Sequence, residues 1–244
     1  MFIAPYMQTS FKTLQGMCVA GDYLITTELD DADTTYRVID IVGKTILSTV
    51  TYQTGHSNTL TYDPDTDNVY CVDYNTLHIM HLNGYALEYV EAITLNISAT
   101  SISFDNGNFY LRETNTQKIY ITDDFSTFTE VMTIDYDNLA DQTPQSICVK
   151  NGMLFAMASG TSSHIERIFV YDLESKELVH EYLWSSYAFG EIEDMDVYRG
   201  NMVVGFNSSS KNIYITPLFT EAPYLFEQTL SRRNTKAMNN EANA

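Results

Sequence analysis

The densest group of side chains that could do chemistry lies in one stretch, GHSNTLTYDPDTDNVYCVDYN, residues 55–75. Within it, three aspartates occupy alternate positions, as in a calcium-binding loop: Asp63, Asp65 and Asp67. A calcium loop needs glycine at its sixth position and a bidentate glutamate at its twelfth, but these positions hold Asn68 and Tyr74. The stretch is therefore interpreted as a hairpin turn in which Pro64 fixes φ, with Ca²⁺ binding as the alternative.

A second acidic stretch, GEIEDMDVY, begins at residue 190 and offers carboxylates for acid–base chemistry. Hydrolysis of a glycoside needs two carboxylates about 5–10 Å apart, on either side of the scissile bond. Glu191, Glu193 and Asp194 belong to one stretch, and no comparable group of carboxylates occurs at the matching places of the chain. We therefore expect no catalytic residue and regard Glu191, Glu193 and Asp194 as candidate ligand-binding residues near the channel. A glycan-active enzyme that uses these carboxylates is the alternative.

Both stretches belong to a pattern that repeats along the chain. Apolar triplets, each followed by a turn and a second β-rich run, begin at Met17, Leu60, Ile102, Ile147 and Met195. Successive triplets are 43, 42, 45 and 48 residues apart, which matches the roughly 40–50 residues of a four-stranded propeller blade. The sequence therefore predicts an all-β fold, a five-bladed β-propeller of four-stranded antiparallel blades.

The period also predicts the bounds of the domain and its blades. The propeller is expected to span residues 1–230, with a flexible tail over 231–244, and its blades to cover about 14–54, 55–97, 98–142, 143–189 and 190–230. The fifth unit lacks an obvious outer strand, so a terminal strand must close the ring. The candidates are FIAPYM at the N-terminus and APYLFEQTL around Tyr224, since their prolines suit an outer edge strand.

One polar residue stands two positions before each apolar triplet. The set is Gln15, Asn58, Thr100, Gln145 and Glu193. Because the innermost strands of a propeller converge on its channel, we expect these side chains to lie together at the channel mouth. They either contact a ligand or bond to free backbone groups of neighbouring blades, and both interpretations also apply to His56.

Aromatic and histidine side chains offer further candidates. Tyr182, Trp184 and Tyr187 form a cluster that suits packing between blades or, alternatively, stacking on a sugar ring. His78 and His81 are three apart on a predicted strand, so they point to opposite faces and cannot readily share a metal. No cofactor is expected.

The charge balance disfavours several partners. The chain has 13 basic and 32 acidic residues, a net charge of −19, which repels nucleic acid and anionic lipid. Its three cysteines form neither a C-x-x-C pair nor a disulfide framework. The N-terminus does not read as a signal peptide, and no apolar run reaches the ~18 residues of a membrane span. We expect no nucleic-acid partner and no membrane insertion, and we expect synthesis in a reducing cytoplasm.

The first stretch resembles a motif of tail and receptor-binding propellers of bacteriophages and prophages. There, a Gly-His-x-Asn segment precedes a hairpin of the form Tyr-[Asn/Asp]-Pro-x-Thr-x-x-[Ile/Val]-Tyr. The matching residues are Gly55, His56, Asn58, Tyr62, Asp63, Pro64, Thr66, Val69 and Tyr70. The resemblance covers one blade. It departs at Thr59, where the family often has aspartate, so a ligand role is not carried over to that position.

The resemblance implies a virion protein that needs no signal peptide. Such a propeller would be a rigid, non-catalytic disc, part of a symmetric oligomer, with other tail proteins and host cell-wall polysaccharide as its partners. A neutral polysaccharide suits the net charge of −19 better than a polyanionic one. A purely structural role in the tail stays open beside host attachment, and so does a cytoplasmic scaffold, because propellers carry many functions.

Overall fold

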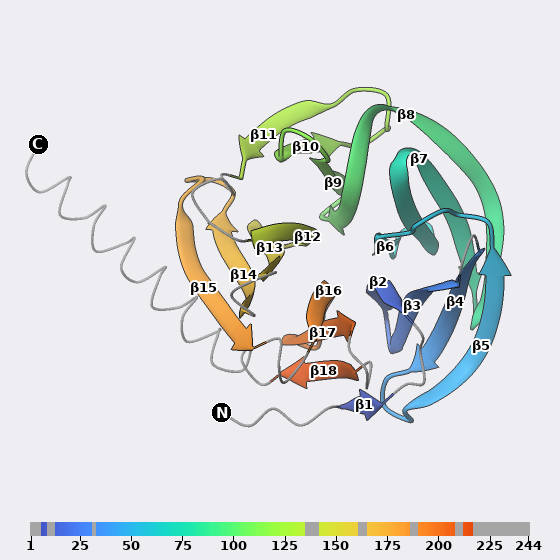
Figure 1. Ribbon diagram of the computed structural model, residues 1–244. Helices are drawn as coiled ribbons and strands as arrows, with labels where there is room; N and C mark the ends of the chain where they lie inside the picture. Colours follow the sequence, from blue (N-terminus) through green and yellow to red (C-terminus); the bar gives the residue numbers. More distant parts are fainter. Residues whose placement is uncertain are drawn as a thin grey trace, which may run out of the picture.

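The computed structural model describes residues 6–8, 13–30, 33–134, 142–160, 165–185, 190–207 and 212–216 (Figure 1). Regular structure in these ranges is entirely β, in antiparallel ladders. None of these residues belongs to a helix that is long and apolar enough to cross a membrane. The all-β class predicted from the sequence is confirmed.

Two of the sheets are simple meanders of four consecutive strands. The first contains β2 (Leu14–Ala20), β3 (Tyr23–Asp30), β4 (Asp33–Asp40) and β5 (Thr45–Tyr52). The other contains β12 (Gln142–Lys150), β13 (Met153–Gly160), β14 (Ile165–Asp172) and β15 (Leu178–Ser185). Turn residues with positive φ separate their strands, as the predicted turns require; Gly21 and Gly152 are examples.

A six-stranded sheet lies between these two meanders. Its strands are β6 (Thr59–Asp63), β7 (Asn68–Asn83), β8 (Ala86–Asp105), β9 (Asn108–Glu113), β10 (Lys118–Thr122) and β11 (Thr129–Thr133). The long strands β7 and β8 each have two partners. The start of β7 pairs with β6 and its end with β8, while the end of β8 pairs with β9.

The last sheet joins the two ends of the described chain. Its strands are β16 (Glu191–Tyr198), β17 (Asn201–Asn207), β18 (Asn212–Thr216) and β1 (Met7–Gln8). Met7 pairs with Ile213, and the Tyr6 N–H donates to the Ile213 carbonyl at 3.0 Å. Of the two candidate outer strands, the N-terminal one is therefore the one found paired. The stretch around Tyr224 and the predicted tail 231–244 lie outside the described residues.

The sheets stand around a common axis, with β2, β6, β12 and β16 nearest the axis and β5, β11 and β15 at the perimeter (Figure 1). This is a β-propeller built from four-stranded antiparallel blades, as predicted. Hydrogen bonding groups the described strands into four sheets, not five, because β7 and β8 run on without interruption and keep six strands in one sheet.

Apolar side chains fill the spaces between neighbouring sheets. Met157 of β13 packs with Met195 and Phe206 of the last sheet, and Ile25 of β3 packs with Leu60 of β6. Narrow sheets have little stability on their own, so these contacts between sheets supply the core. The three cysteines are buried and free, in agreement with the absence of a disulfide framework.

Candidate functional site

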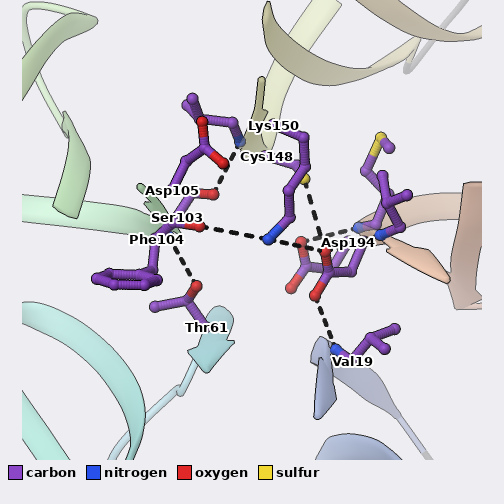
Figure 2. Close-up of polar contacts among 12 residues, drawn as sticks. Val19, Thr61, Ser103, Phe104, Asp105, Cys148, Lys150 and Asp194 are labelled. Atoms are coloured by element: carbon purple, nitrogen blue, oxygen red, sulfur yellow. Dashed lines mark hydrogen bonds and ion pairs between the residues drawn. The ribbon is translucent and has the colours of Figure 1, made fainter. Parts of the chain in front are cut away.

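Hydroxyl side chains on the innermost strands tie each strand to the next one around the axis. A threonine or serine Oγ accepts a hydrogen bond from a backbone N–H of the neighbouring strand (Figure 2). These bonds, all 2.7–2.8 Å long, join Thr59 to Ile102, Thr61 to Phe104, Ser101 to Ile147 and Ser103 to Val149. They satisfy backbone donors that would otherwise be buried without partners.

Two aspartates do the same between the last sheet and the first. The Asp194 carboxylate accepts bonds from the Met17 N–H and from the Ser146 hydroxyl, both at 2.8 Å. The Asp196 carboxylate accepts the Val19 N–H at 2.7 Å. Asp194 is only 1% exposed, and its carboxylate links three innermost strands. It therefore acts as a structural side chain and does not line the channel mouth, where the sequence had suggested a ligand-binding or catalytic role.

In the first sheet, a glycine occupies the position equivalent to Asp194. A Cβ on Gly16 would lie 2.9 Å from the Cα of Thr59, so the two strands approach too closely for a side chain. Because Gly16 has no side chain, the hydroxyl of Thr27 on β3 makes the link to the neighbouring sheet. Its Oγ1 accepts the Gly16 N–H at 2.7 Å and donates to the Ser57 carbonyl at 3.1 Å.

A cavity of about 360 Å³ lies where the innermost strands begin, and we call it the polar cavity. Its lining contains all five polar residues that precede the triplets, together with two more of the predicted residues. The described lining residues are Gln15, His56, Asn58, Thr100, Arg112, Thr114, Gln117, Pro144, Gln145, Glu191, Glu193 and Asn207. The sequence pattern thus leads to one shared location, while ligand binding there stays a prediction.

Irregularities in the ladders explain why these side chains turn inward. The pairing register of four innermost strands shifts at the polar position, which leaves an extra residue opposite the partner strand. Such bulges re-aim side chains and are frequent beside functional sites. The residues at these shifts are Gln15, Thr100, Gln145 and Glu193.

Arg112 of β9 is the main residue of this cavity that the sequence analysis missed. It is only 3% exposed. Its guanidinium donates to Gln117 Oε1 at 2.7 Å, to Thr100 Oγ1 at 3.0 Å and to the carbonyl of Gln145. The available signal was the cation that directly follows the apolar run FYL of this strand, since an arginine in such a position is rarely buried unless it is paired.

The opposite wall of the lining carries two carboxylates of β16. Glu191 accepts a bond from Gln145 Nε2 at 2.7 Å. Burial raises the pKa of Glu193 well above that of an exposed glutamate, and the charge of Glu191 raises it further, whereas a bond from Asn207 lowers it. Glu193 therefore keeps its proton to higher pH than an exposed glutamate does. The cavity combines a fixed cation, a proton-holding carboxyl group and several amides.

The acidic turn and the aromatic cluster lie elsewhere. The Asp63 carboxylate accepts the Asp65 N–H at 2.9 Å and the Thr66 hydroxyl at 2.7 Å, and Asp67 accepts the Tyr62 hydroxyl. These carboxylates stabilise the hairpin turn. No set of three or more His, Cys, Asp or Glu side chains that could hold a metal ion is present among the residues described.

Tyr182 lies on β15, the outermost strand of its sheet. Its ring packs edge-on against His180, with 4.4 Å between the centroids, and burial raises the pKa of its hydroxyl. Tyr182 also packs against the apolar cluster that contains Met195 and Phe206 of the last sheet, which fits the packing interpretation, and it is not part of the polar cavity. The side chain of Trp184 and the whole of Tyr187 lie outside the described residues.

No protein-family model matches the chain, and no curated protein matches its sequence. Solved structures do match its shape. A crystal structure of glutaminyl cyclase from Myxococcus xanthus superposes with a TM-score of 0.67 at 11% identity, over 88% of this chain and 94% of that one. Hydrazine synthase of Kuenenia stuttgartiensis matches with a TM-score of 0.49 at 13% identity, over 84% and 58% of the two chains. The WD40 repeats of RRP9 match with a TM-score of 0.47 at 10% identity, over 83% and 60%. At this identity the first likeness establishes the propeller fold alone.

Proposed function

We propose that the ring contains five blades and that the six-stranded sheet holds two of them. The backbone of β7 turns at Tyr74, where φ is +53°. Its two halves lie side by side, because the Leu82 N–H donates to the Asp67 carbonyl at 2.8 Å and His81 Nδ1 lies 3.2 Å from Asn68 Oδ1. Strand β6, the two halves of β7 and the start of β8 then make one blade. The end of β8 and β9–β11 make the next.

The hydrogen bonds along the axis support the same count. The residue directly before each triplet contacts a neighbouring innermost strand, by a side-chain hydrogen bond or, at the glycine, by close backbone approach. These residues, one for each proposed blade, are Gly16, Thr59, Ser101, Ser146 and Asp194. The bond from Met17 to Asp194 and the pairing of β1 with β18 join the last blade to the first. In this proposal, the N-terminal strand closes the ring.

For this propeller we propose non-catalytic binding, as a virion protein that attaches to a host-surface glycan or serves as an adaptor in tail assembly. The observation that carries the proposal is the polar cavity, in which polar side chains from all five repeats converge. Amides and hydroxyls both donate and accept hydrogen bonds, so they suit a neutral polyol better than an ion. The net charge of −19 disfavours a polyanionic glycan in the same way.

The test is a titration of neutral cell-wall polysaccharides with the wild type and with Asn58→Ala and Gln15→Ala. Each variant removes one side chain that lines the cavity, and we expect about fivefold weaker binding from each, the effect of one lost hydrogen bond. Thr129→Ala, on an exposed outer strand, is the matched control. Unchanged binding in both cavity variants, or release of reducing ends by the wild type, would contradict the proposal. If no polysaccharide binds, only the adaptor role survives, and it requires a stable complex with another tail protein.

The carboxylates of the polar cavity favour a second candidate, an enzyme that uses acid–base catalysis. Glu193 holds its proton to raised pH beside Glu191, and such a group can donate and accept a proton in turn. The reaction would be hydrolysis of a glycoside or, as the likeness to the M. xanthus glutaminyl cyclase suggests, cyclisation of an N-terminal glutamine. In the latter, the α-amine attacks the side-chain amide carbon, ammonia leaves, and Glu193 carries the proton from the amine to the leaving nitrogen.

Two assays decide this candidate. Ammonia release from a peptide with N-terminal glutamine tests cyclisation, and release of reducing ends tests glycoside hydrolysis. We expect Glu193→Gln to lower any turnover by about 100-fold or more, the usual contribution of a general acid–base group. The candidate is rejected if the wild type turns over neither substrate, or if the variant keeps full activity.

A further inference from the structure

A second cavity of about 580 Å³ lies where the innermost strands end, and we call it the aromatic cavity. Its lining includes Tyr62, Phe104, Asp105, Lys150, Tyr198 and Arg199. The volume falls within the roughly 300–1,000 Å³ of small-molecule sites. Three phenyl or phenol rings contribute to this lining, whereas the described lining of the polar cavity contains no Phe, Tyr or Trp.

Contacts to their neighbours hold the aromatic rings of this cavity in place. The Tyr198 hydroxyl donates to Asp22 Oδ1 at 2.9 Å, and the Tyr62 hydroxyl donates to Asp67. The ring of Phe104 packs against that of Phe109, with 4.9 Å between centroids. Walls that are already ordered lose little conformational entropy when a ligand binds. The cavity is therefore prepared to accept a flat apolar surface.

Lys150 places an ammonium group in the same lining. Its Nζ lies 3.5 Å from Asp196 Oδ1 and donates to the carbonyl of Phe104 at 3.3 Å (Figure 2). Burial acts to lower the pKa of Lys150, but the charge of Asp196, with that of Asp105, raises it overall. The ammonium therefore stays protonated. It has three N–H donors and, among the described residues, two acceptors, so one donor is left for a ligand.

The charges of this cavity nearly cancel. Arg199 pairs with Asp22 at 2.7 Å and Lys150 pairs with Asp196. The Asp105 side chain has, among the described residues, the amide of Asn106 at 3.1 Å and no ion pair. An anionic ligand would meet this remaining carboxylate and a protein of net charge −19. A neutral ligand that both donates and accepts hydrogen bonds avoids this repulsion.

We infer that the aromatic cavity is a second ligand site, which takes a neutral pyranose ring of a carbohydrate. The C–H face of the sugar contacts the rings of Tyr62, Phe104 and Tyr198, whose negative faces attract its positively polarised hydrogens. Sugar hydroxyls accept from Lys150 and donate to Asp105. This site does not depend on the function proposed for the polar cavity.

The experiment titrates methyl glycosides of glucose, galactose, mannose and N-acetylglucosamine, with binding measured by saturation-transfer NMR. We expect at least one to bind the wild type, and Tyr198→Leu and Lys150→Met each to weaken it about fivefold or more. Methyl glucuronide, an anionic analogue, should bind more weakly than methyl glucoside. Thr129→Ala, on the exposed outer strand β11, is the control and should leave the affinity unchanged. Asn58→Ala reports on binding in the polar cavity and so separates the two sites.

Thermal melts verify that each variant folds, and Asp105→Asn replaces any variant that does not. The inference is overturned if no methyl glycoside binds, or if folded variants bind as well as the wild type. Stronger binding of the glucuronide, or of a small alkylamine, would identify an ion site instead and would also overturn it. A loss of binding in Asn58→Ala alone would assign the sugar to the polar cavity.

Discussion

The polar and aromatic cavities lie at opposite ends of the same innermost strands, yet their linings differ in kind. Apart from His56 and Pro144, the residues at one end are amides, hydroxyls and charged groups, whereas the other end combines charged groups with aromatic and aliphatic side chains. The pairs four residues apart are Gln15 and Val19, Asn58 and Tyr62, Thr100 and Phe104, and Glu193 and Val197. Four residues of strand span about 13 Å. Two side chains that are only four residues apart on one strand therefore lie in two different chemical environments.

The difference matters because the two ends carry different energetic costs. Burial of Arg112 and Glu193 at the polar end is costly unless hydrogen bonds compensate, and the structure supplies partners for the guanidinium. The aromatic rings at the other end gain free energy from burial itself. Charged groups kept in a costly position are better candidates for function than apolar ones, which would be buried in any case.

The largest expected effect comes from the strand junction that both cavities share. Asp194→Ala removes the acceptor of the Met17 N–H and the Ser146 hydroxyl, and we expect it to lower the free energy of unfolding by about 2–5 kcal/mol, because buried donors lose their partner. Urea unfolding measures this change, and ligand binding should weaken at both ends. Glu191→Ala, exposed on the same strand, is the control and should cost under about 0.5 kcal/mol. A loss below about 1 kcal/mol in Asp194→Ala would show that the junction is not needed.

A substitution in the polar cavity should lower stability and leave ligand binding in the aromatic cavity unchanged. We expect Arg112→Met to lower the free energy of unfolding by about 2–3 kcal/mol, since Gln117 and Thr100 lose a charged donor. Arg112→Lys keeps the charge but loses the fork of donors, so its loss should be intermediate. Urea unfolding gives both values. Methyl glycoside binding at the aromatic end should not change in either variant, and a parallel loss there would mean that the ends are coupled.

The pH dependence of stability should have opposite signs at the two ends. Burial raises the pKa of Glu193, so its contribution is full below the unfolded value near 4.3 and is lost as pH rises through the folded pKa. The bond from Tyr198, with the nearby Arg199, lowers the pKa of Asp22, so its contribution is present above the unfolded value and is lost as pH falls through the folded pKa.

Melting temperatures of Glu193→Gln and Asp22→Asn across this pH range test the contrast. Relative to the wild type, Glu193→Gln should gain stability as pH rises above about 4.3, and Asp22→Asn should gain as pH falls below about 3.9. The effect of Asp22 should be the smaller one, because solvent screens its carboxylate. If the melting temperature relative to the wild type changed with pH in the same direction in both variants, the two ends would not differ in their pH dependence.

The smallest effect is expected from calcium. The carboxylates of Asp63 and Asp67 already accept hydrogen bonds within the turn beside the aromatic cavity. Millimolar Ca²⁺ should therefore leave the melting temperature unchanged, and Asp65→Asn should behave like the wild type. A specific ion at 100 times its dissociation constant would add about 2.7 kcal/mol. A clear rise that Asp65→Asn abolishes would restore the calcium interpretation.

Much of the architecture could be predicted because the repeat is visible in turn residues and apolar triplets. The polar positions were also predictable, since Gln15, Asn58 and Gln145 share one offset from those triplets. Asp194 adjoins Glu193 in sequence, yet it is buried and does not line the polar cavity. Neighbouring residues of a strand point to opposite faces, and the bulge at Glu193 decides which one faces the cavity.

The sequence alone determined the all-β class, the period of the blades, the turns and the places where polar side chains recur, because these depend on local preferences and spacing. The tertiary structure decided what no local pattern contains. In the tertiary structure, Arg112 donates a hydrogen bond to the carbonyl of Gln145, the Asp194 carboxylate accepts the N–H of Met17, and β1 pairs with β18. The physical reason is that these contacts join residues far apart in the chain, and only the arrangement of the sheets around one axis brings them within hydrogen-bonding distance.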